Sequence, residues 1–527
     1  MEVVKKRLGP SDRYWTMIRS TRLLIALTAI ALLCVPLLGC GGGQAGRTSS
    51  PSAFDSIKQR GESYLNNSGH ELARGKTDGA SIYSVSAALD TTGKSVNGQE
   101  HVQYTNRSTD NLSEVVFRVY ASEAGTGEAP KPTVIDGATA NGRKVDARLE
   151  GSYLTVSVPG GIKPHGQAVV SFSFSEPVPP AGQEQTDGLF AYEDGTFDLG
   201  NFLPTVVRYS GGGWDKRPIP WYGDVNYYDA SYYSVSLEAP SGYVVAATGV
   251  ESGGSGGTHT FVAGPVRDFE AQVSNKYQVT RRQVGSTTVA SYYFDKDSRA
   301  GGEALNSGSQ ALRLFSEHFG PYPYTRLNIC EAPLDASGME YSGQVQIGSF
   351  LYEDPADAAD LDGTVAHEVG HQWWALGVGS DAIGLPWLDE SLTSYCEVLY
   401  YRWLEGEASA QESLAELADN YSSARADGVP DVVVEQPVSA FTSADQYTAV
   451  VYGKGPFLFN ELWKSLGPAA FEKSLSEYYR KNVFLNATTE DLLAPFRANS
   501  GGSGTVDQLY QRWIKEIHGD EDMPSGS

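Results

Sequence analysis

The stretch VAHEVGHQWW, residues 365–374, carries two histidines four positions apart, with a glutamate directly after the first. On an α-helix, residues four apart lie one turn apart on the same face, so the imidazoles of His367 and His371 can reach one ion. Glu368 is offset by about 100° and can lie beside a water molecule on that ion. Because this five-residue pattern also occurs in helices that bind no metal, it indicates a zinc site only when a third ligand follows.

The candidate third ligand is a glutamate 19 positions after His371. Glu390 lies in PWLDESLTSYCE, which has the spacing of another amphipathic helix. A carboxylate between Leu388 and Leu392 is costly to bury unless it is paired, and binding to a metal resolves that cost. The sequence therefore predicts a zinc ion held by two imidazoles and one carboxylate, with one position left for water.

The chain around these motifs divides into a β-rich part and a helical part. Its 527 residues, 40% of them hydrophobic, exceed what one core holds, because single cores stop growing near about 250–300 residues. From about residue 82, segments such as SEVVFRVY and QAVVSFSFS alternate apolar and polar residues between turn residues, which predicts a β saddle or sandwich domain over 76–290. In the following domain, 291–527, helical spacing predicts helices over about 358–376, 387–404, 408–424, 447–465, 468–482 and 505–517.

The N-terminus has a basic segment followed by an uncharged apolar run from Leu23 to Gly39 and then by Cys40. The run is short for a membrane span, which needs about 20 apolar residues. It resembles a bacterial lipoprotein signal peptide, which implies removal of residues 1–39, lipidation of Cys40 and anchoring on the extracytoplasmic face of the cell membrane. Residues 40–75 then act as a tether. An ordinary N-terminal anchor helix is the alternative.

The net charge excludes some classes of binding partner, and the cysteine content leaves two possible states for one pair of residues. The formal net charge is −24, and loss of residues 1–39, with six basic and two acidic side chains, makes it −28. Such a charge argues against nucleic acid and anionic lipid as partners.

Outside the signal region only Cys330 and Cys396 follow Cys40. They either form a disulfide or stay as two buried thiols.

The sequence resembles the gluzincin metallopeptidases of the aminopeptidase N family over about residue 80 to the end. HEVGH, then 18 residues, then the glutamate of WLDES matches the family's zinc motif. SGMEYSG stands where the family has Gly-x-Met-Glu-Asn, and VVYGKGPFLFNELWKSLG is similar to its Tyr-x-Lys-Gly helix. The resemblance implies an α+β multidomain fold, in which a β saddle domain precedes a thermolysin-like, mostly helical zinc peptidase domain.

The resemblance also implies a role for each matching residue. His367, His371 and Glu390 become the ligands of one zinc ion per chain, and Glu368 becomes the general base. The other matching positions are Tyr452, which stabilises the tetrahedral intermediate, Glu340, which binds a free α-amine, Glu397, which supports the zinc helices, and Gly338 and Met339, whose strand aligns the peptide substrate.

Three departures from the family pattern leave alternatives open. Tyr341 replaces the family asparagine, and Ala375 and Leu376 replace Gly-Asn. No residue of the saddle domain stands out as a partner for Glu340, and the irregular aromatic stretch 201–228 either frames a cleft or covers a sheet edge. Tyr447, five positions before Tyr452, either faces the cleft or packs elsewhere.

The expected activity is hydrolysis of peptide bonds, with removal of N-terminal residues. The alternatives are an endopeptidase or dipeptide-releasing enzyme, which the change at Tyr341 motivates, another hydrolase on the same zinc site, such as one that opens an epoxide, or a surface binding protein with a catalytically silent site. The last needs neither Glu368 nor Tyr452.

Overall fold

The computed structural model describes residues 51–123, 132–182, 188–220, 222–225, 227–502 and 504–524. The predicted signal peptide, Cys40 and the first part of the predicted tether lie outside these residues. Within the described ranges, no helix combines the length and the apolar character that crossing a membrane requires.

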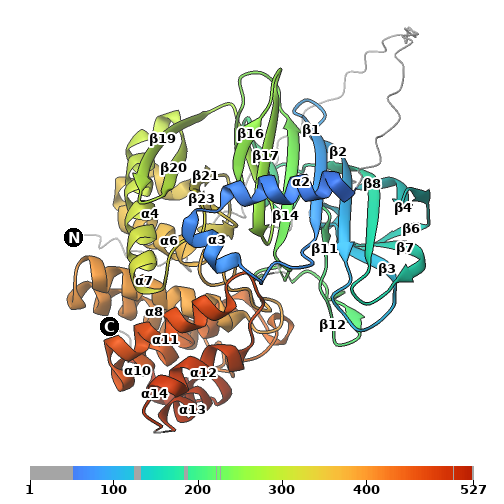
Figure 1. The fold of residues 1–527 in the computed structure, drawn as a ribbon. Coiled ribbons are helices and arrows are strands. Elements are labelled where there is room, and N and C mark those ends of the chain that lie inside the picture. The colour runs from blue at the N-terminus through green and yellow to red at the C-terminus, as the bar shows by residue number, and fades with distance from the viewer. Residues whose placement is uncertain are drawn as a thin grey trace. The chain divides into compact units, whose positions relative to one another are not determined.

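An eight-stranded sheet forms the main layer of the N-terminal β-rich part (Figure 1). Strands β1 and β14 are parallel, and every other neighbouring pair is antiparallel. From one edge to the other the strands are β16 (Val250–Gly253), β17 (Thr258–Val266), β14 (Ser231–Glu238), β1 (Ile82–Asp90), β2 (Ser95–Thr105), β8 (Gln167–Pro177), β4 (Val134–Ala140) and β5 (Arg143–Lys144).

Two four-stranded sheets and a short hairpin complete this part among the described residues. One sheet has the order β15 (Val244–Ala247), β18 (Ala271–Ser274), β10 (Thr196–Leu199) and β9 (Phe190–Glu193). The other has the order β11 (Thr205–Val206), β3 (Leu112–Arg118), β7 (Tyr153–Ile162) and β6 (Ala147–Glu150), and the hairpin pairs β12 (Tyr209–Ser210) with β13 (Gly213–Trp214). Phe117 of β3 meets Phe172 of β8 edge to face at 5.1 Å between ring centroids, so the alternating apolar residues of two sheets share one core.

A separate five-stranded sheet begins the helical part. Its order is β19 (Tyr277–Val284), β20 (Thr287–Phe294), β21 (Arg326–Ala332), β23 (Gln344–Gly348) and β22 (Gly338–Tyr341). Strand β19 and most of β20 lie within the predicted 76–290 domain, but β20 pairs with β21 in parallel, so both strands belong to this sheet. Alternation of apolar residues predicts a strand but not the sheet that the strand joins. The sequence patterns of β19 and β20 therefore do not differ from those of the strands before them.

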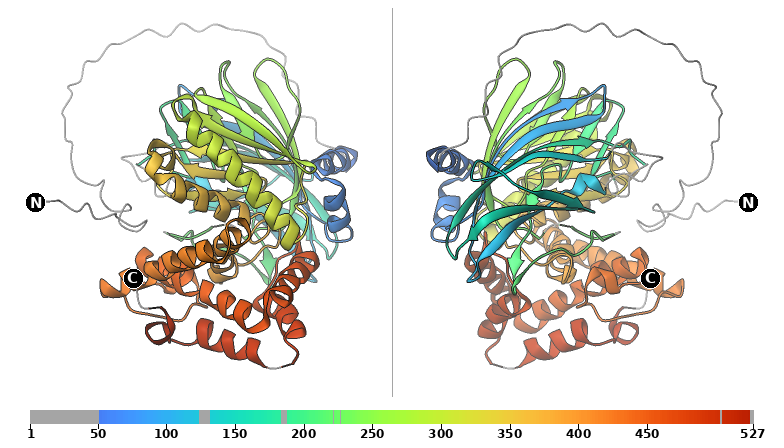
Figure 2. Two further views of the ribbon diagram at one scale, coloured as in Figure 1. Left: turned by 90° about the vertical axis from the view of Figure 1, so that its left-hand side faces the viewer. Right: turned by 90° about the vertical axis from the view of Figure 1, so that its right-hand side faces the viewer.

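The helices lie over this sheet and beyond it, and Figure 2 shows the last of them grouped on one side of the β-rich part. Helix α4 (Ser298–His318) packs against both β20 and α6 (Ala358–Gly370), and α6 packs against α7 (Glu390–Leu404). Further α-helices in this part of the chain are α5 (Phe350–Glu353), α8 (Glu407–Ala426), α9 (Ala444–Tyr447), α10 (Pro456–Leu466), α11 (Pro468–Asn482), α12 (Thr489–Asn499), α13 (Thr505–Tyr510) and α14 (Gly519–Asp522). Short 3₁₀ and π turns are η1 (Glu62–Tyr64), η2 (Tyr120–Ser122), η3 (Asp295–Asp297), η4 (Pro355–Asp357), η5 (Pro386–Leu388), η6 (Val438–Ala440), η7 (Thr448–Lys454) and η8 (Gln511–Lys515).

Two helices in the predicted tether range are folded onto the rest of the chain. Helix α2 (Pro51–Gly61) crosses the eight-stranded sheet, where Phe54 is fully buried (Figure 1). Asn66 caps α3 (Asn67–Ala73) by accepting a hydrogen bond from Gly69 N at 2.9 Å, and its Nδ2 donates to Tyr322 O at 2.8 Å. The segment from residue 51 onward therefore connects the β-rich part with the helical part, and a flexible tether does not extend through it.

Candidate metal centre

Helix α6 ends where the metal motif ends. The sequence predicts a helix to residue 376, but the α-helix stops at Gly370 and His371 is its C-cap. Ala375, with φ of 96°, takes the left-handed conformation that ends helices and that glycine adopts more easily. The backbone at His371 is still α-helical, with φ −60° and ψ −19°, so both imidazoles keep the one-turn spacing that the sequence predicts.

The two histidines and Glu390 converge on one point. Nε2 of His367 and Nε2 of His371 are 3.0 Å apart, and Oε2 of Glu390 lies 3.3 Å from the first and 3.4 Å from the second. Three ligand atoms of a tetrahedral zinc ion, each about 2.0–2.1 Å from it, lie roughly 3.3–3.4 Å apart. The donor set and its triangle therefore fit a zinc ion with a fourth position free.

The other ring nitrogen of each histidine is held by a hydrogen-bond acceptor. Nδ1 of His371 donates to Trp374 O at 3.0 Å, and Nδ1 of His367 donates to Oε1 of Glu397 at 2.7 Å. These bonds fix the tautomer in which each Nε2 carries a lone pair toward the other. Two facing lone pairs repel unless a cation lies between them, which supports the metal assignment.

Burial and charge set the electrostatics of the centre. Burial lowers the pKa of His371, which favours the neutral imidazole that a metal needs. Burial opposes ionisation of Glu390, but its interactions with His371 and His367 outweigh that effect and hold the pKa of Glu390 well below its ordinary value. Burial raises the pKa of Glu368 to about 8, with the neighbouring carboxylates of Glu390 and Glu397 acting in the same direction and His367 against them.

Glu368 lies beside the triangle with an unused oxygen. The residue is 6% exposed, and its Oε2 has no hydrogen-bond partner among the described residues. Gly338 of β22 packs directly on it, because a Cβ built at Gly338 would lie 2.3 Å from Oε1 of Glu368. Glycine is therefore required at this point for the strand and the carboxylate to approach each other.

Strand β22 sorts its side chains between two faces. Gly338 contacts Glu368, and Glu340, two residues on, has an oxygen within 4.8 Å of ligand atoms of Glu368 and His371. Met339 and Tyr341 belong to the opposite face, where they form a small apolar cluster with residues that include Leu334.

The change to Tyr341 therefore does not alter the metal side of the strand. The Tyr341 ring is fully buried, and its hydroxyl accepts a hydrogen bond from Asn201 Nδ2 at 3.4 Å. Asn201 belongs to the β-rich part, so this tyrosine joins the two parts of the chain behind the strand.

A π-helix brings Tyr452 to the metal centre. Tyr452 lies in η7, and its ring is 6.1 Å from the ring of His367 between centroids. A π-helix bonds residues five apart, so Tyr447, the N-cap of η7, lies near Tyr452 with 5.7 Å between ring centroids. Lys454 of the same segment is buried and pairs with Asp431 at 2.7 Å, which ties η7 in place. The predicted helix over 447–465 is thus partly of the π type.

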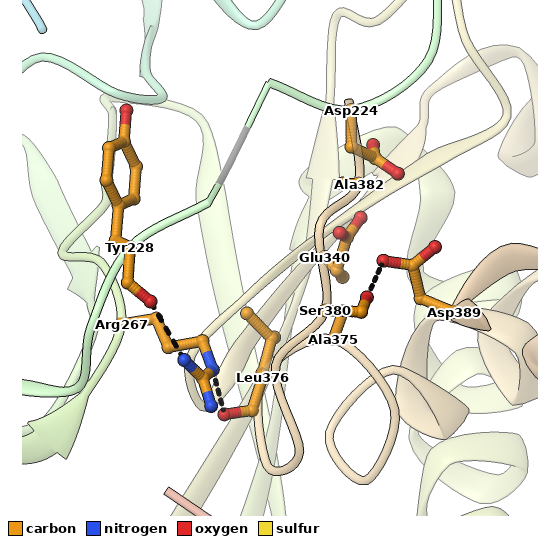
Figure 3. A pocket seen from close by; sticks show the side chains of 9 residues that line it. All are labelled: Asp224, Tyr228, Arg267, Glu340, Ala375, Leu376, Ser380, Ala382 and Asp389. Atoms are coloured by element: carbon orange, nitrogen blue, oxygen red, sulfur yellow. Dashed lines mark hydrogen bonds between the residues drawn. The ribbon is translucent and has the colours of Figure 1, made fainter. Parts of the chain in front are cut away.

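A small cavity opens beside Glu340 (Figure 3). Its lining includes Asp224, Glu340 and Asp389 on one side and Arg267 on the other. Asp389 lies directly before Glu390 and could have been singled out from that adjacency. Asp224 carries no such signal, because it is an isolated acid in the irregular stretch 201–228. That stretch therefore lines part of the cavity, and its strand β11 pairs with β3.

The two cysteines lie in different elements. Cys330 of β21 and Cys396 of α7 are both fully buried and free. Sγ of Cys396 accepts a hydrogen bond from Trp374 Nε1 at 3.1 Å. Of the two alternatives for this pair, the structure has the buried thiols.

Comparison with known proteins agrees with this geometry. Residues 303–513 match the peptidase family M1 domain. Aminopeptidase M1 of Arabidopsis thaliana is 31% identical over 223 residues, which is 40% of this chain and 25% of that protein. Aminopeptidase N of Lactobacillus delbrueckii subsp. lactis is 30% identical over 200 residues, 36% of this chain and 24% of that protein. The chain thus spans about a quarter of the length of these curated relatives.

Solved structures extend the likeness to most of the chain. An M1 zinc metallopeptidase from Deinococcus radiodurans has a TM-score of 0.61 at 19% identity and covers 84% of this chain and 94% of its own. A variant of that enzyme bound to a Tyr-Ser-Ala substrate has a TM-score of 0.61 at 18% identity, with 84% and 95% covered. The predicted multidomain fold, with a β-rich domain before a mostly helical one, is confirmed by this likeness. Residues 303–513, which include His367, His371 and Glu390, match the peptidase family M1 domain.

Proposed function

We propose that the protein is a zinc metallopeptidase that hydrolyses peptide bonds and removes residues from the free N-terminus of peptides. The observation that carries this proposal is the triangle of two imidazole nitrogens and one carboxylate oxygen, 3.0–3.4 Å apart, beside an unpaired oxygen of Glu368. The match to the M1 domain, and the likeness to proteins named as aminopeptidases and to an M1 zinc metallopeptidase, support the same activity.

His367, His371 and Glu390 would hold the zinc ion, with Glu397 fixing the first imidazole. A zinc ion in such a site lowers the pKa of a water molecule toward about 7 and polarises a carbonyl group. The remaining roles, which are proton transfer, stabilisation of the developing negative charge and binding of the substrate, are assigned to side chains of the protein.

Glu368 is the proposed general base. Its Oε2 takes the proton of the attacking water and later delivers it to the leaving amine. The buried position keeps this oxygen from other protein donors, so it remains available for the water. The Tyr452 hydroxyl donates a hydrogen bond to the oxygen on which negative charge develops, and loss of one such donor typically costs about 10²–10³ in turnover.

Glu340 is the proposed partner of the substrate's α-amine, and the backbone of Gly338 and Met339 aligns the peptide. Tyr341 lies on the opposite face of β22 from Glu340, so the sequence change that motivates an endopeptidase leaves the amine side of the strand intact. The exopeptidase is therefore the function that the site supports best.

Cleavage assays test the activity. Peptides with a free and with an acetylated N-terminus are incubated with the protein, with and without a chelator. We expect cleavage of the free peptide alone, loss of cleavage with the chelator, and loss in the Glu368→Gln variant. Glu412→Gln, an exposed glutamate of α8, is the matched control and should keep wild-type activity. Equal cleavage of both peptides would favour an endopeptidase. If Glu368→Gln cleaves as well as wild type, a hydrolase of another type is favoured. If neither protein cleaves either peptide, a binding protein is favoured.

The membrane location is proposed from the sequence alone. A basic segment, an apolar run and the Gly39–Cys40 junction support lipidation at Cys40, which places the protein on the extracytoplasmic face of the cell membrane. Mass spectrometry of the protein from membranes tests this. An acylated Cys40 at the mature N-terminus is expected, and an uncleaved residue 1–39 segment would contradict it.

A further inference from the structure

A second cavity lies in the β-rich part, at the end of the eight-stranded sheet where β1 and β14 begin and β2 ends (Figure 1). We call it the arginine cavity, because Arg107 and Arg208 both line it. No residue that lines it belongs to the metal centre or to the lining of the cavity beside Glu340. The arginine cavity therefore has no role in the proposed reaction.

A neutral acceptor holds the guanidinium group of Arg107. Its Nε and Nη2 atoms donate to the backbone oxygen of Asp78 at 3.1 and 2.8 Å. The other terminal nitrogen, Nη1, lies 3.8 Å from Oδ2 of Asp229, which is too long for a hydrogen bond. The orientation of the group is thus fixed without a carboxylate, and the donors of Nη1 remain for a ligand.

The guanidinium group of Arg208 is also positioned by a neutral side chain. Its Nη1 donates to the hydroxyl of Tyr227, and the group lies over the Tyr227 ring at 4.9 Å from the centroid. Its Nε is 3.4 Å from Oδ1 of Asp229, longer than the 2.7–2.9 Å that is typical of a charge-assisted hydrogen bond. That Oδ1 atom accepts instead from Asn486 Nδ2 at 2.7 Å. Asp229 therefore pairs only loosely with both arginines.

The charges that line the arginine cavity do not balance. Asp229 is the one acid that lines it among the described residues, so two guanidinium groups share one carboxylate. Arg217, which also lies over the Tyr227 ring, is different, because it pairs with both Asp215 and Asp381. A local excess of one positive charge, in a chain whose formal net charge is −24, suits a ligand with one negative charge.

The size of the arginine cavity limits that ligand. About 40 Å³ is open to the centres of water-sized groups, and one such centre needs about 10–15 Å³, so there is room for about three. A carboxylate group has three heavy atoms and one charge, and its two oxygens match the donors of a guanidinium group. A phosphate group has five heavy atoms and close to two charges, so it fits neither the space nor the charge. Ser81 and Tyr104 also line the cavity and bring hydroxyl donors.

We infer that the arginine cavity is a binding site for the carboxylate group of a small organic anion, and that Arg107 and Arg208 are its ligands' hydrogen-bond donors. Both guanidinium groups are held in place before the anion arrives, so binding orders few further side-chain torsions. A free organic acid and the C-terminal end of a peptide both offer this group. The inference does not depend on the proposed peptidase function, because the site is separate from the metal centre.

Binding of acetate to the full-length, zinc-loaded protein tests the inference. Broadening of the carboxylate NMR signal of ¹³C-labelled acetate is measured at one fixed salt concentration, and we expect a Kd on the order of 1 mM. Arg107→Gln and Arg208→Gln each remove a charge and its donors, so each should weaken binding by about 10- to 100-fold. Arg143→Gln, an exposed arginine of β5, is the matched control and should bind acetate as wild type does.

Two further comparisons identify the place and the ligand. His371→Ala lacks a predicted zinc ligand, so unchanged acetate binding in this variant is expected if the acetate lies in the arginine cavity and not on the metal. Inorganic phosphate should displace acetate only at a concentration well above the acetate Kd. N-acetyl-alanine carries the carboxylate of a peptide end: displacement of acetate by it supports the site with a peptide as the source, and failure to displace supports it with a free acid.

Three results would overturn the inference. They are no acetate binding by wild type, wild-type affinity in both arginine variants at an unchanged thermal midpoint, and loss of binding in His371→Ala alone, which places the acetate on the metal. Displacement by phosphate below the acetate Kd would overturn the assignment to a carboxylate. If Arg208→Gln does not fold, Arg107→Gln provides the test, because the Arg107 side chain is 38% exposed. None of these measurements uses peptide cleavage, so they leave the proposed function to its own assay.

Discussion

Gly338 and Glu368 lie so close that no side chain fits between them: a Cβ on Gly338 would lie 2.3 Å from Oε1 and 2.7 Å from Cδ of Glu368. The strand that aligns the substrate in our proposal therefore also sets the position of the proposed general base. Substrate alignment and proton transfer are coupled at this contact.

Replacing Gly338 by alanine is expected to displace the Glu368 carboxylate. Because a shift of about 1 Å in a catalytic group can cost roughly 10²-fold, we predict a fall in kcat of at least that order. Zinc content should stay near wild type, since the three ligands lie on α6 and α7. Gly302→Ala, in α4 where nothing lies within 4 Å of the new Cβ, is the matched control and should keep full activity. Equal activity of the two variants would contradict the assigned role of Glu368.

The Glu397→Gln variant tests how the first imidazole is held. The carboxylate accepts the Nδ1 proton of His367 at 2.7 Å, which makes the opposite nitrogen a better ligand. A neutral amide acceptor should weaken zinc binding by about 10- to 100-fold, measured by competition with a chelator of known affinity. Glu405→Gln, at the C-cap of the same helix, should bind zinc as wild type does. An unchanged zinc affinity in Glu397→Gln would contradict the role of Glu397 in holding His367.

Glu331 of β21, outside the metal centre, is predicted to make the stability of the protein depend on pH. Burial raises its pKa to about 9, and its Oε1 has no hydrogen-bond partner in the described chain. The unfolded chain loses this proton near pH 4.5 while the folded chain keeps it, so the free energy of unfolding falls as pH rises from about 4.5 to about 9. The limit for one proton is about 1.4 kcal/mol per pH unit. Urea titrations should show Glu331→Gln gaining stability relative to wild type over this range; a constant difference would contradict the prediction.

The buried thiols should be unreactive in the folded protein. Burial raises the pKa of Cys330 and of Cys396 well above the ordinary value, so neither forms the thiolate that reacts. Iodoacetamide followed by peptide mass spectrometry should leave both unmodified without denaturant and label both with it. A peptide in which Cys330 and Cys396 are joined would show instead that they pair.

Local spacing was sufficient to predict that His367, His371 and Glu390 converge. His367 and His371 sit one turn apart on any helix, and Glu390 is an acid at a position that an amphipathic helix buries, so short-range pattern and polarity identify them. The same reasoning predicted the alternating strands and most helices. It did not predict that α6 ends at Gly370, nor that Ala375 beyond this end adopts a left-handed conformation that its side chain disfavours.

Long-range contacts are what the sequence did not reveal. Asp224 is 116 positions before Glu340 in the chain, and only the docking of Tyr222 and Gly223 on the helical part brings the two acids to one cavity. The assignment of β19 and β20 to the second sheet has the same cause. The two-residue period of a strand predicts which face each side chain lies on but not which strand pairs with it. The sheet that a strand joins is therefore known only from the tertiary structure.

Zinc analysis of the purified protein tests the central claim most directly. Elemental analysis after removal of loosely bound metal should give about one zinc ion per chain in wild type and close to none when His371 is replaced by alanine. A wild-type protein that binds no zinc in the presence of excess metal, or an His371→Ala variant that retains a full equivalent, would contradict the assignment of His367, His371 and Glu390 as the metal ligands.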